Sequence, residues 1–127
     1  MQERHTNSNQ RRRMSYNNYR KCIEACNMCA VACLHCATAC LKEDDIKMLS
    51  KCIQLDQDCA DICQLAVRFM TRESGFSSRI CELCAEICEA CGEECKQHTN
   101  MEHCQKCAKA CFECASQCRE MAKMETA

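Results

Sequence analysis

The stretch CIEACNMCAVACLHCATAC, residues 22–40, decides the fold. It holds six cysteines at successive spacings of 4, 3, 4, 3 and 4 residues. On an α-helix such spacings keep every side chain on one stripe, as they keep the core positions of a coiled coil. A thiol therefore stands wherever a bundle helix normally places a large apolar residue.

The same pattern occurs in three copies along the chain. Cys-x2-Cys-Ala-x2-Cys-x2-Cys-x3-Cys matches CNMCAVACLHCATAC at 26–40, CELCAEICEACGEEC at 81–95 and CQKCAKACFECASQC at 104–118. A fourth segment departs from it, with Cys52, Cys59 and Cys63 and with Leu55 and Ile62 expected at neighbouring inward positions. Four cysteine-bearing helices are therefore predicted.

Few residues in this chain would interrupt a helix, since it has no Pro and only two Gly. We predict helices from about Ser15 to Lys42, from Asp44 and Asp45 to Thr71, from Ser78 to Gln97, and from a capping box at Thr99 and Glu102 to Lys123. Gly75 lies in the RESGFSS break between the second and third.

Short loops favour antiparallel neighbours. The predicted fold is all-α, an antiparallel up-down four-helix bundle with a cysteine-lined core. The bundle is expected to span residues 15–123, between a polar N-terminal tail at 1–14 and a C-terminal tail at 124–127.

Composition limits the class of protein. A chain of 127 residues with net charge -1 fits one domain and gives no indication of nucleic acid or an anionic membrane as partner. No run of about 18 apolar residues exists, so we expect a transmembrane helix to be excluded. The amino terminus is polar and has no apolar signal region. We therefore expect a cytoplasmic protein whose thiols stay reduced.

Nineteen cysteines allow several interpretations. A purely structural core of small thiols would leave voids. Redox dithiols of thioredoxin type lie beside a strand, and no strand pattern is visible. Disulfides within one helix suit S–S geometry poorly. Metal binding by thiolates remains the favoured interpretation.

The net charge of a metal-filled core favours Cu(I) as the metal. Tetrahedral zinc sites need four thiolates each and would leave two excess negative charges per site inside the core. Cu(I) accepts two or three sulfurs, and each thiolate can bridge two ions, so one Cu(I) per thiolate leaves the core close to neutral. A metallothionein-like zinc or cadmium buffer stays open as an alternative, and so does a thiol–disulfide protein.

Over residues 15–123 the repeated cysteine pattern resembles the copper storage proteins, four-helix bundles whose inward cysteines hold many Cu(I) ions. That family has exported and cytosolic members, and the missing signal peptide makes this chain resemble the cytosolic branch. The resemblance implies a non-enzymatic Cu(I) store, commonly a homo-oligomer (a tetramer of bundles), with a copper chaperone or a copper enzyme as further partners. It also implies one open end with His or Met near it.

The predicted metal ligands are all the cysteines and four residues near one end. They are Cys22, Cys26, Cys29, Cys33, Cys36, Cys40, Cys52, Cys59, Cys63, Cys81, Cys84, Cys88, Cys91, Cys95, Cys104, Cys107, Cys111, Cys114 and Cys118, with His98, His103, Met48 and Met101. Copper is expected to enter at the end that collects the four, since imidazole and thioether bind Cu(I) more weakly than bridging thiolate. Tyr19, Phe69, Met70, Phe76 and Met121 are expected to plug the other end.

Overall fold

The structure, a computed structural model, describes the backbone of residues 2–126 and the side chains of residue 17 and residues 19–124. Within that range it contains helices and loops and no strand. The elements are α1 (Gln2–Leu41), the 3₁₀ turn η1 (Lys47–Leu49), α2 (Ser50–Thr71), α3 (Ser77–Gln97) and α4 (Glu102–Thr126). The extreme ends of the two predicted tails, Met1 and Ala127, lie outside the described residues.

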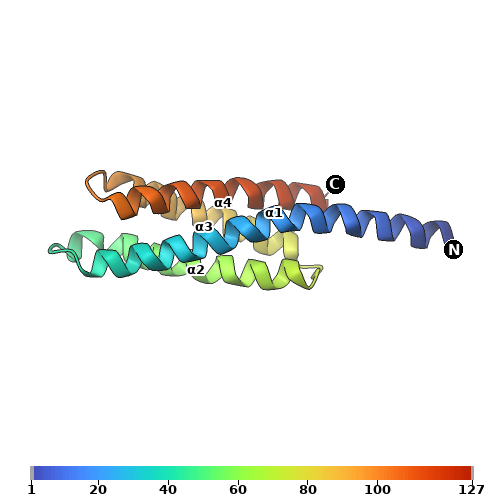
Figure 1. Cartoon of the computed structure of the whole chain (residues 1–127), viewed down its shortest axis with the longest axis horizontal. Helices are drawn as coiled ribbons and strands as arrows, with labels where there is room; N and C mark the ends of the chain where they lie inside the picture. Colours follow the sequence, from blue (N-terminus) through green and yellow to red (C-terminus); the bar gives the residue numbers. More distant parts are fainter. Residues whose placement is uncertain (1, 127) are drawn as a thin grey trace.

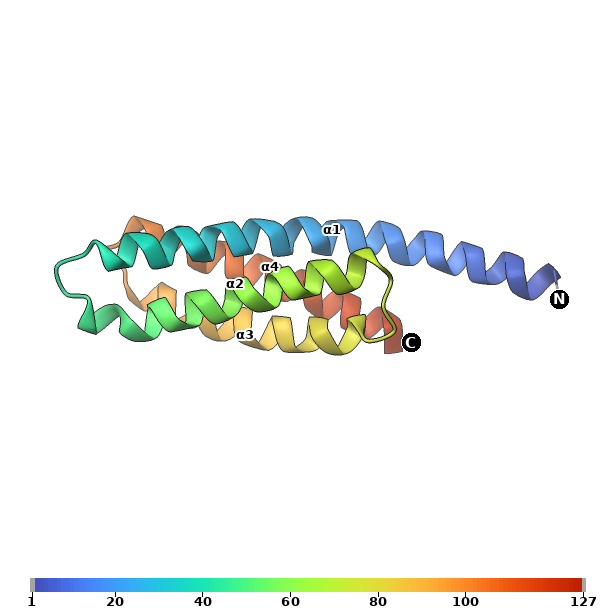
Figure 2. The same ribbon diagram turned by 90° about the horizontal axis from the view of Figure 1, so that it is seen from below.

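The four helices run antiparallel to their chain neighbours (Figures 1 and 2). α1 packs against α2 and α4, and α3 packs against the same two helices. The loops at 42–49 and 98–101 lie at one end of the bundle, here named the mouth end. The loop at 72–76 lies at the opposite end, here named the closed end. The predicted up-down four-helix bundle is confirmed.

The starts of α1 and α2 differ from the prediction. α1 begins at Gln2, and its amino-terminal part continues beyond the closed end of the bundle (Figures 1 and 2). No Pro or Gly interrupts this segment, so the helix continues where the cysteine pattern stops. α2 begins at Ser50 and not at Asp44 or Asp45. Instead, an oxygen of Asp45 accepts a hydrogen bond from the Met48 amide at 3.4 Å and holds the turn that precedes the helix.

The predicted capping box at Thr99 is wrong, because α4 begins only at Glu102. The Met101 amide donates to the His98 carbonyl at 3.1 Å and closes the connection. The side-chain amide of Gln105 then donates to the carbonyls of His98, at 2.8 Å, and Cys95, at 3.4 Å. A side chain from α4 thus satisfies the otherwise unpaired carboxyl end of α3.

The cysteines form the core, as predicted. All nineteen have 0% exposed surface, and alanines flank them on each helix. The segment Tyr19–Leu41 of α1 is long and apolar enough to cross a membrane by length and composition alone. The sequence argument against such a helix therefore does not hold by itself. The six cysteines in this segment are nonetheless buried inside the bundle, which is the arrangement of a core helix.

Gly92, buried in α3, faces the ring of Phe112 on α4. A Cβ added at Gly92 would lie 2.8 Å from a ring carbon of Phe112. We expect Gly92→Ala to lower the free energy of unfolding by about 1 kcal/mol, because overpacking outweighs the gain in helix propensity. In a Phe112→Leu background the same substitution should instead stabilise the bundle by about 1 kcal/mol, the propensity difference. Urea unfolding of the reduced proteins measures both values, and equal effects in both backgrounds would contradict the clash.

Candidate metal centre

The nineteen inward Sγ atoms, here named the thiol column, run along the bundle axis. Sulfurs from different helices approach closely. The Sγ atoms of Cys59 and Cys88 are 3.2 Å apart, and those of Cys22 and Cys118 are 3.6 Å apart. Within one helix, the Sγ atoms of Cys36 and Cys40 are 3.9 Å apart. No cysteine is paired in a disulfide. The thiols therefore face one another in reduced form along the whole core.

Groups of four thiols, each within 4.8 Å of one another, follow one another along the column. They include Cys26, Cys63, Cys84 and Cys114; Cys29, Cys63, Cys88 and Cys114; Cys29, Cys33, Cys59 and Cys111; Cys33, Cys91, Cys107 and Cys111; and Cys36, Cys40, Cys52 and Cys104. Several neighbouring groups share thiols: Cys63 and Cys114 belong to the first two, and Cys29 links the second to the third. A column with shared ligands suits metal ions that are bridged by sulfur.

The distances also fit a soft metal. With metal–sulfur bonds of about 2.3 Å, two sulfurs on one ion lie about 3.8–4.0 Å apart in tetrahedral or trigonal geometry. The Sγ–Sγ contacts of 3.2–4.0 Å, from Cys59–Cys88 to Cys91–Cys95, lie close to that range. Small side-chain adjustments would therefore be enough to place ions between the thiols.

Asp56 is a carboxylate inside the thiol column that sequence reasoning missed. It is 0% exposed. Its Oδ1 accepts hydrogen bonds from the thiols of Cys91, at 3.1 Å, Cys107, at 3.3 Å, and Cys95, at 3.5 Å. The sequence spacing could have indicated this inward position, since Asp56 follows Cys52 by four residues and precedes Cys59 by three. It stands in the register that holds cysteine in α1, whereas the predicted inward residue Leu55 is only partly buried.

Burial raises the pKa of Asp56 to about 10, and the negative charge of Cys107 and Cys91 acts in the same direction. The Asp56 carboxyl therefore stays protonated in the folded apo-protein, whereas in the unfolded chain it loses its proton near the ordinary pKa of 3.8. Because the folded state binds more protons over this range, the stability due to this group is fully present below about pH 4 and is lost as pH rises towards 10.

We predict that Asp56→Asn flattens this pH dependence. Between pH 5 and 8 the free energy of unfolding of the reduced apo-protein should fall more steeply than that of the variant, by up to about 1.4 kcal/mol per pH unit, the value for one proton. Urea unfolding at four pH values measures the slopes. Asp61→Asn, at an exposed position of the same helix, is the control. Parallel slopes for the wild type and Asp56→Asn would contradict a protonated Asp56.

His103 is placed at the mouth end of the thiol column. Its Nε2 lies 3.5 Å from the Sγ of Cys40, and Cys40 lies 3.8 Å from Cys104. Burial raises the pKa of Cys40 to about 11, and the negative charge of Cys52 adds to this effect. An imidazole in contact with a thiol that holds its proton firmly can accept that proton when a metal ion arrives.

The other three predicted mouth residues differ in position. The Nε2 of His98 lies 2.8 Å from the carboxylate of Glu94, a mostly buried residue that sequence reasoning did not single out. Met101 is partly buried and packs against the core. Met48 is 56% exposed and lies in η1, outside the core. His103 therefore lies beside thiols, whereas His98 pairs with a carboxylate. That His98, His103, Met48 and Met101 bind the metal remains a prediction.

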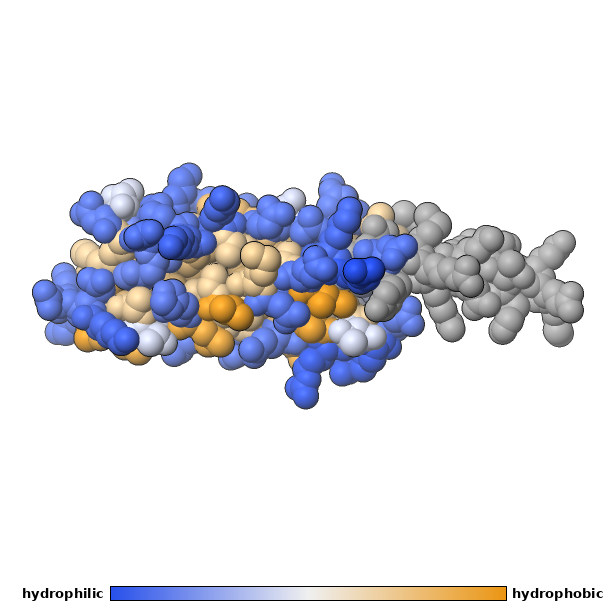
Figure 3. All heavy atoms as spheres, viewed as in Figure 1, coloured by the Kyte–Doolittle hydropathy of each residue, from blue (hydrophilic) through white to orange (hydrophobic). Residues whose placement is uncertain are grey.

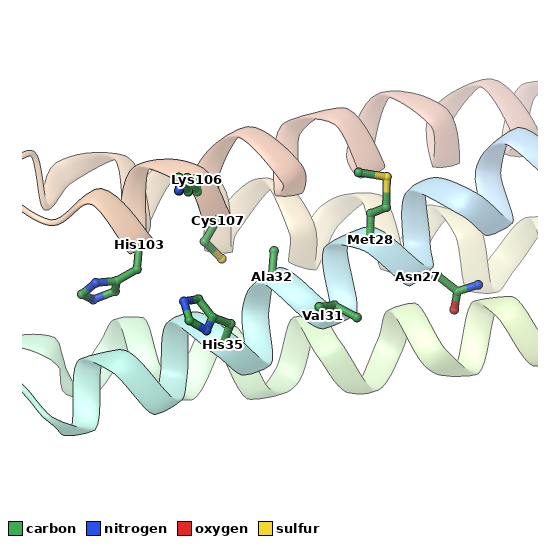
Figure 4. Close-up of a pocket in the computed structure, with 8 residues that line it drawn as sticks. All are labelled: Asn27, Met28, Val31, Ala32, His35, His103, Lys106 and Cys107. Carbon is green, nitrogen blue, oxygen red and sulfur yellow. The ribbon is translucent and has the colours of Figure 1, made fainter.

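His103 also borders a groove of about 480 Å³ between α1 and α4 (Figure 4). Its wall includes the exposed side chains of His35, Met28 and Val31. Cys107, which lines the groove from below, is 0% exposed. The groove is thus a surface feature whose lining is mostly apolar.

We predict that His103→Ala slows Cu(I) uptake about tenfold, the lower end of the effect of removing a group that supports a metal ligand. The total number of ions bound should change by at most one. Stopped-flow transfer from a Cu(I) chelator measures the rate. His35→Ala, on the opposite wall of the groove, should load at the wild-type rate. Equal rates for wild type and His103→Ala would place copper entry elsewhere.

The closed end is plugged by fewer residues than predicted. Met70 and Met121 are buried, at 0% and 2% exposure, but Phe76 is 61% exposed. Phe69 is only partly buried and carries the guanidinium of Arg72 over its ring, at 4.5 Å. Tyr19 is buried as expected, at 3% exposure, whereas the prediction is wrong for Phe76 and only partly met for Phe69. Phe76 lies in the short loop between α2 and α3, in which Glu73 is in the left-handed region at φ 52°.

A four-helix bundle whose inward stripes are almost entirely thiol defines a class of protein that holds several soft metal ions along one axis. This chain belongs to the copper storage protein family, whose sequence pattern (Csp) matches residues 15–123.

Comparison with individual proteins gives the same result. The chain is 58% identical to the Cu(I)-bound copper storage protein BsCsp3, with a TM-score of 0.79 over 83% of this chain and 98% of that one. It is 40% identical to a cytosolic copper storage protein from Streptomyces lividans, solved during copper loading, with a TM-score of 0.83 over 87% of this chain and 96% of that one.

Among curated relatives, the uncharacterized cysteine-rich protein YhjQ of Bacillus subtilis (strain 168) is 60% identical over 59 residues. That match covers 46% of this chain and spans 55% of the relative's length.

Proposed function

We propose that this protein stores Cu(I) in the cytoplasm along the thiol column, with each thiolate bridging two ions. The observation that carries this proposal is the sharing of thiols between neighbouring four-thiol groups, such as Cys29 in two of them. Separate zinc tetrahedra would need groups that share no ligand. Similarity to the Cu(I)-bound BsCsp3 and to the cytosolic Streptomyces lividans protein supports copper as the metal and the cytoplasm as the location.

In this proposal the protein has no catalytic role. Loading replaces thiol protons by Cu(I), and the protons leave to solvent. The nineteen cysteines would be the ligands, and His103 and Met101 would guide ions in at the mouth end. His98 and Met48 would act as weaker outer contacts. A copper chaperone or a copper enzyme would give or receive the metal.

We also propose that the chain assembles with copies of itself, as a tetramer. Support comes from exposed apolar side chains of α1, with Met28 71% exposed, Val31 69% and Leu41 52%. Figure 3 shows apolar residues across the middle of the face where α1 and α4 lie side by side. Scattered apolar residues are ordinary on surfaces, but a continuous apolar region indicates a contact. Light scattering of the apo and loaded protein measures the mass.

An anaerobic Cu(I) titration of reduced apo-protein against a chromogenic chelator tests the proposed function, with zinc and cadmium titrated in parallel. Uptake near one Cu(I) per cysteine, about 19 per chain, is expected for a bridged column. Copper should displace zinc and cadmium. Saturation near four ions, with zinc retained against copper, would refute copper storage and support the metallothionein-like buffer.

A further inference from the structure

One layer of side chains follows the last thiols at the closed end, with one residue from each helix. The residues are Tyr19 of α1, Met70 of α2, Ser77 of α3 and Met121 of α4. Each continues the inward stripe of its helix, three or four residues from the neighbouring inward position. All four are buried, at 3%, 0%, 0% and 2% exposure. This layer is therefore part of the same axis as the thiol column.

The two methionines differ from the others whose side chains the structure describes. Met28, Met48 and Met124 are at least half exposed, and Met101 is only partly buried. Met70 and Met121 alone are fully buried in that set, and both stand in cysteine register. In α2 the inward positions run Cys52, Asp56, Cys59, Cys63, Ala66 and Met70; in α4 they run Cys104, Cys107, Cys111, Cys114, Cys118 and Met121. A thioether thus takes the next place after the thiols.

The last thiol layer is one sulfur short. Cys22, Cys81 and Cys118 occupy three of its four inward positions, and Ala66 occupies the fourth. The Sγ atoms of Cys22 and Cys118 are 3.6 Å apart, and Cys118 also contacts Cys26 at 3.7 Å. Because Ala66 has no donor atom, ions at this end lack a ligand on the α2 side. Met70, one helical turn beyond Ala66, is the nearest inward sulfur on that helix.

A second, independent observation comes from Ser77. Its Oγ is the one buried side-chain nitrogen or oxygen that has no hydrogen-bond partner among the side chains described. Burying a hydroxyl without a partner costs free energy, so such an atom calls for an explanation. Ser77 precedes Cys81 by four residues and so lies on the same face of α3. A thiolate at this end, formed when metal binds, is a much stronger acceptor than the neutral thiol.

We propose that the closed end holds a terminal Cu(I) site in which the thioethers of Met70 and Met121 complete the ligand set of Cys22, Cys81 and Cys118. A thioether is a soft donor that suits Cu(I) and carries no charge. It therefore adds a ligand without adding a negative charge, while the displaced thiol protons leave to solvent. The two methionines therefore end the thiol column without adding charge, and their side chains also fill the end of the bundle.

A purely steric plug is the competing explanation, and it makes a different prediction. Leucine has a similar volume and fills such a position without loss of packing. If the methionines only exclude water, leucine at both positions should leave the metal environment unchanged. If they bind Cu(I), the loaded protein must show sulfur from methionine bonded to copper at this end.

Selenium absorption spectroscopy separates the two explanations. The protein is labelled with selenomethionine in a Met48→Leu/Met101→Leu background, which removes the mouth-end thioethers. Three proteins are loaded with Cu(I): the background, the background with Met70→Leu/Met121→Leu, and a matched control with Met28→Leu/Met124→Leu. A selenium–copper scattering path should appear in the background and the control and disappear in the closed-end variant. Circular dichroism and a free-thiol count verify that all three are folded and reduced.

The terminal site rests on the proposed Cu(I) storage, and the same samples keep the two separable. Copper uptake is titrated for each protein before spectroscopy. Uptake near one ion per cysteine without a selenium–copper path would overturn the terminal site alone. A path that survives Met70→Leu/Met121→Leu would also overturn it. Wild-type protein, with Met48 and Met101 in place, that takes up no Cu(I) in the same titration would overturn both proposals.

Discussion

Loading with Cu(I) is expected to raise the melting temperature of the bundle by more than about 15 °C. A ligand that binds only the folded state, held free at 1,000 times its dissociation constant, adds about 4.1 kcal/mol for a single site. For a domain of this size each kcal/mol shifts the melting temperature by about 4 °C. Many sites along one column make this a lower bound. Calorimetry of the reduced apo and loaded proteins, both kept anaerobic, measures the shift.

The expected rise in melting temperature follows from the composition of the apo-protein core. It packs nineteen small thiols where other bundles place larger apolar side chains. Copper adds bonds that cross between all four helices, because each four-thiol group combines cysteines from several of them. Removal of the metal with a competing chelator should return the melting temperature to the apo value. A shift below about 2 °C, under half the effect expected from 1 kcal/mol, would mean that copper does not bind the folded core.

The second large effect concerns the number of ions lost with one group of ligands. Serine at four positions should remove about four Cu(I) ions if each thiolate contributes one bridged ion. If the same group were a separate tetrahedral site, the loss would be one ion. The group near the middle of the column is the best choice: Cys29, Cys33, Cys59 and Cys111. Capacity is measured by anaerobic titration against a chelator.

A matched control keeps the thiols and adds the same hydroxyls. Four buried alanines that neighbour the column are changed to serine, one on each helix: Ala30, Ala60, Ala85 and Ala108. This protein should bind about as many ions as there are cysteines, about 19. Loss of a single ion from the four-cysteine variant, with the control unchanged, would contradict a bridged column. An equal loss in both would show that buried hydroxyls, and not missing thiols, limit loading.

Most of the fold could be predicted because one local pattern repeats. The 3- and 4-residue spacings from Cys22 to Cys40 fix a helix and its inward face at the same time. Two copies of the pattern in α3 and α4 confirm the same face independently. The ends of helices were less predictable, since they depend on contacts between elements. Gln105 of α4 closes the end of α3, and nothing in the local sequence at Thr99 indicates this.

The candidate site was predictable where residues repeat and unpredictable where they do not. Every cysteine lies in the core. Asp56 was missed because a carboxylate in a helix normally faces water, and only its place between Cys52 and Cys59 suggests otherwise. Phe76 was expected in the plug because large apolar residues are usually buried, yet it is 61% exposed. The backbone direction in a loop, and not residue type, decides such a position.

The sequence by itself determined the helices, their inward stripes and the soft-donor chemistry of the core. These follow from residue type and from the fixed geometry of one helix, which need no knowledge of its neighbours. Only the tertiary structure decided which sulfurs from different helices share a group, that His103 contacts Cys40 while His98 pairs with Glu94, and that Met70 and Ser77 belong to the same axis. Those relations depend on the relative height of four antiparallel helices, which loops and packing set together.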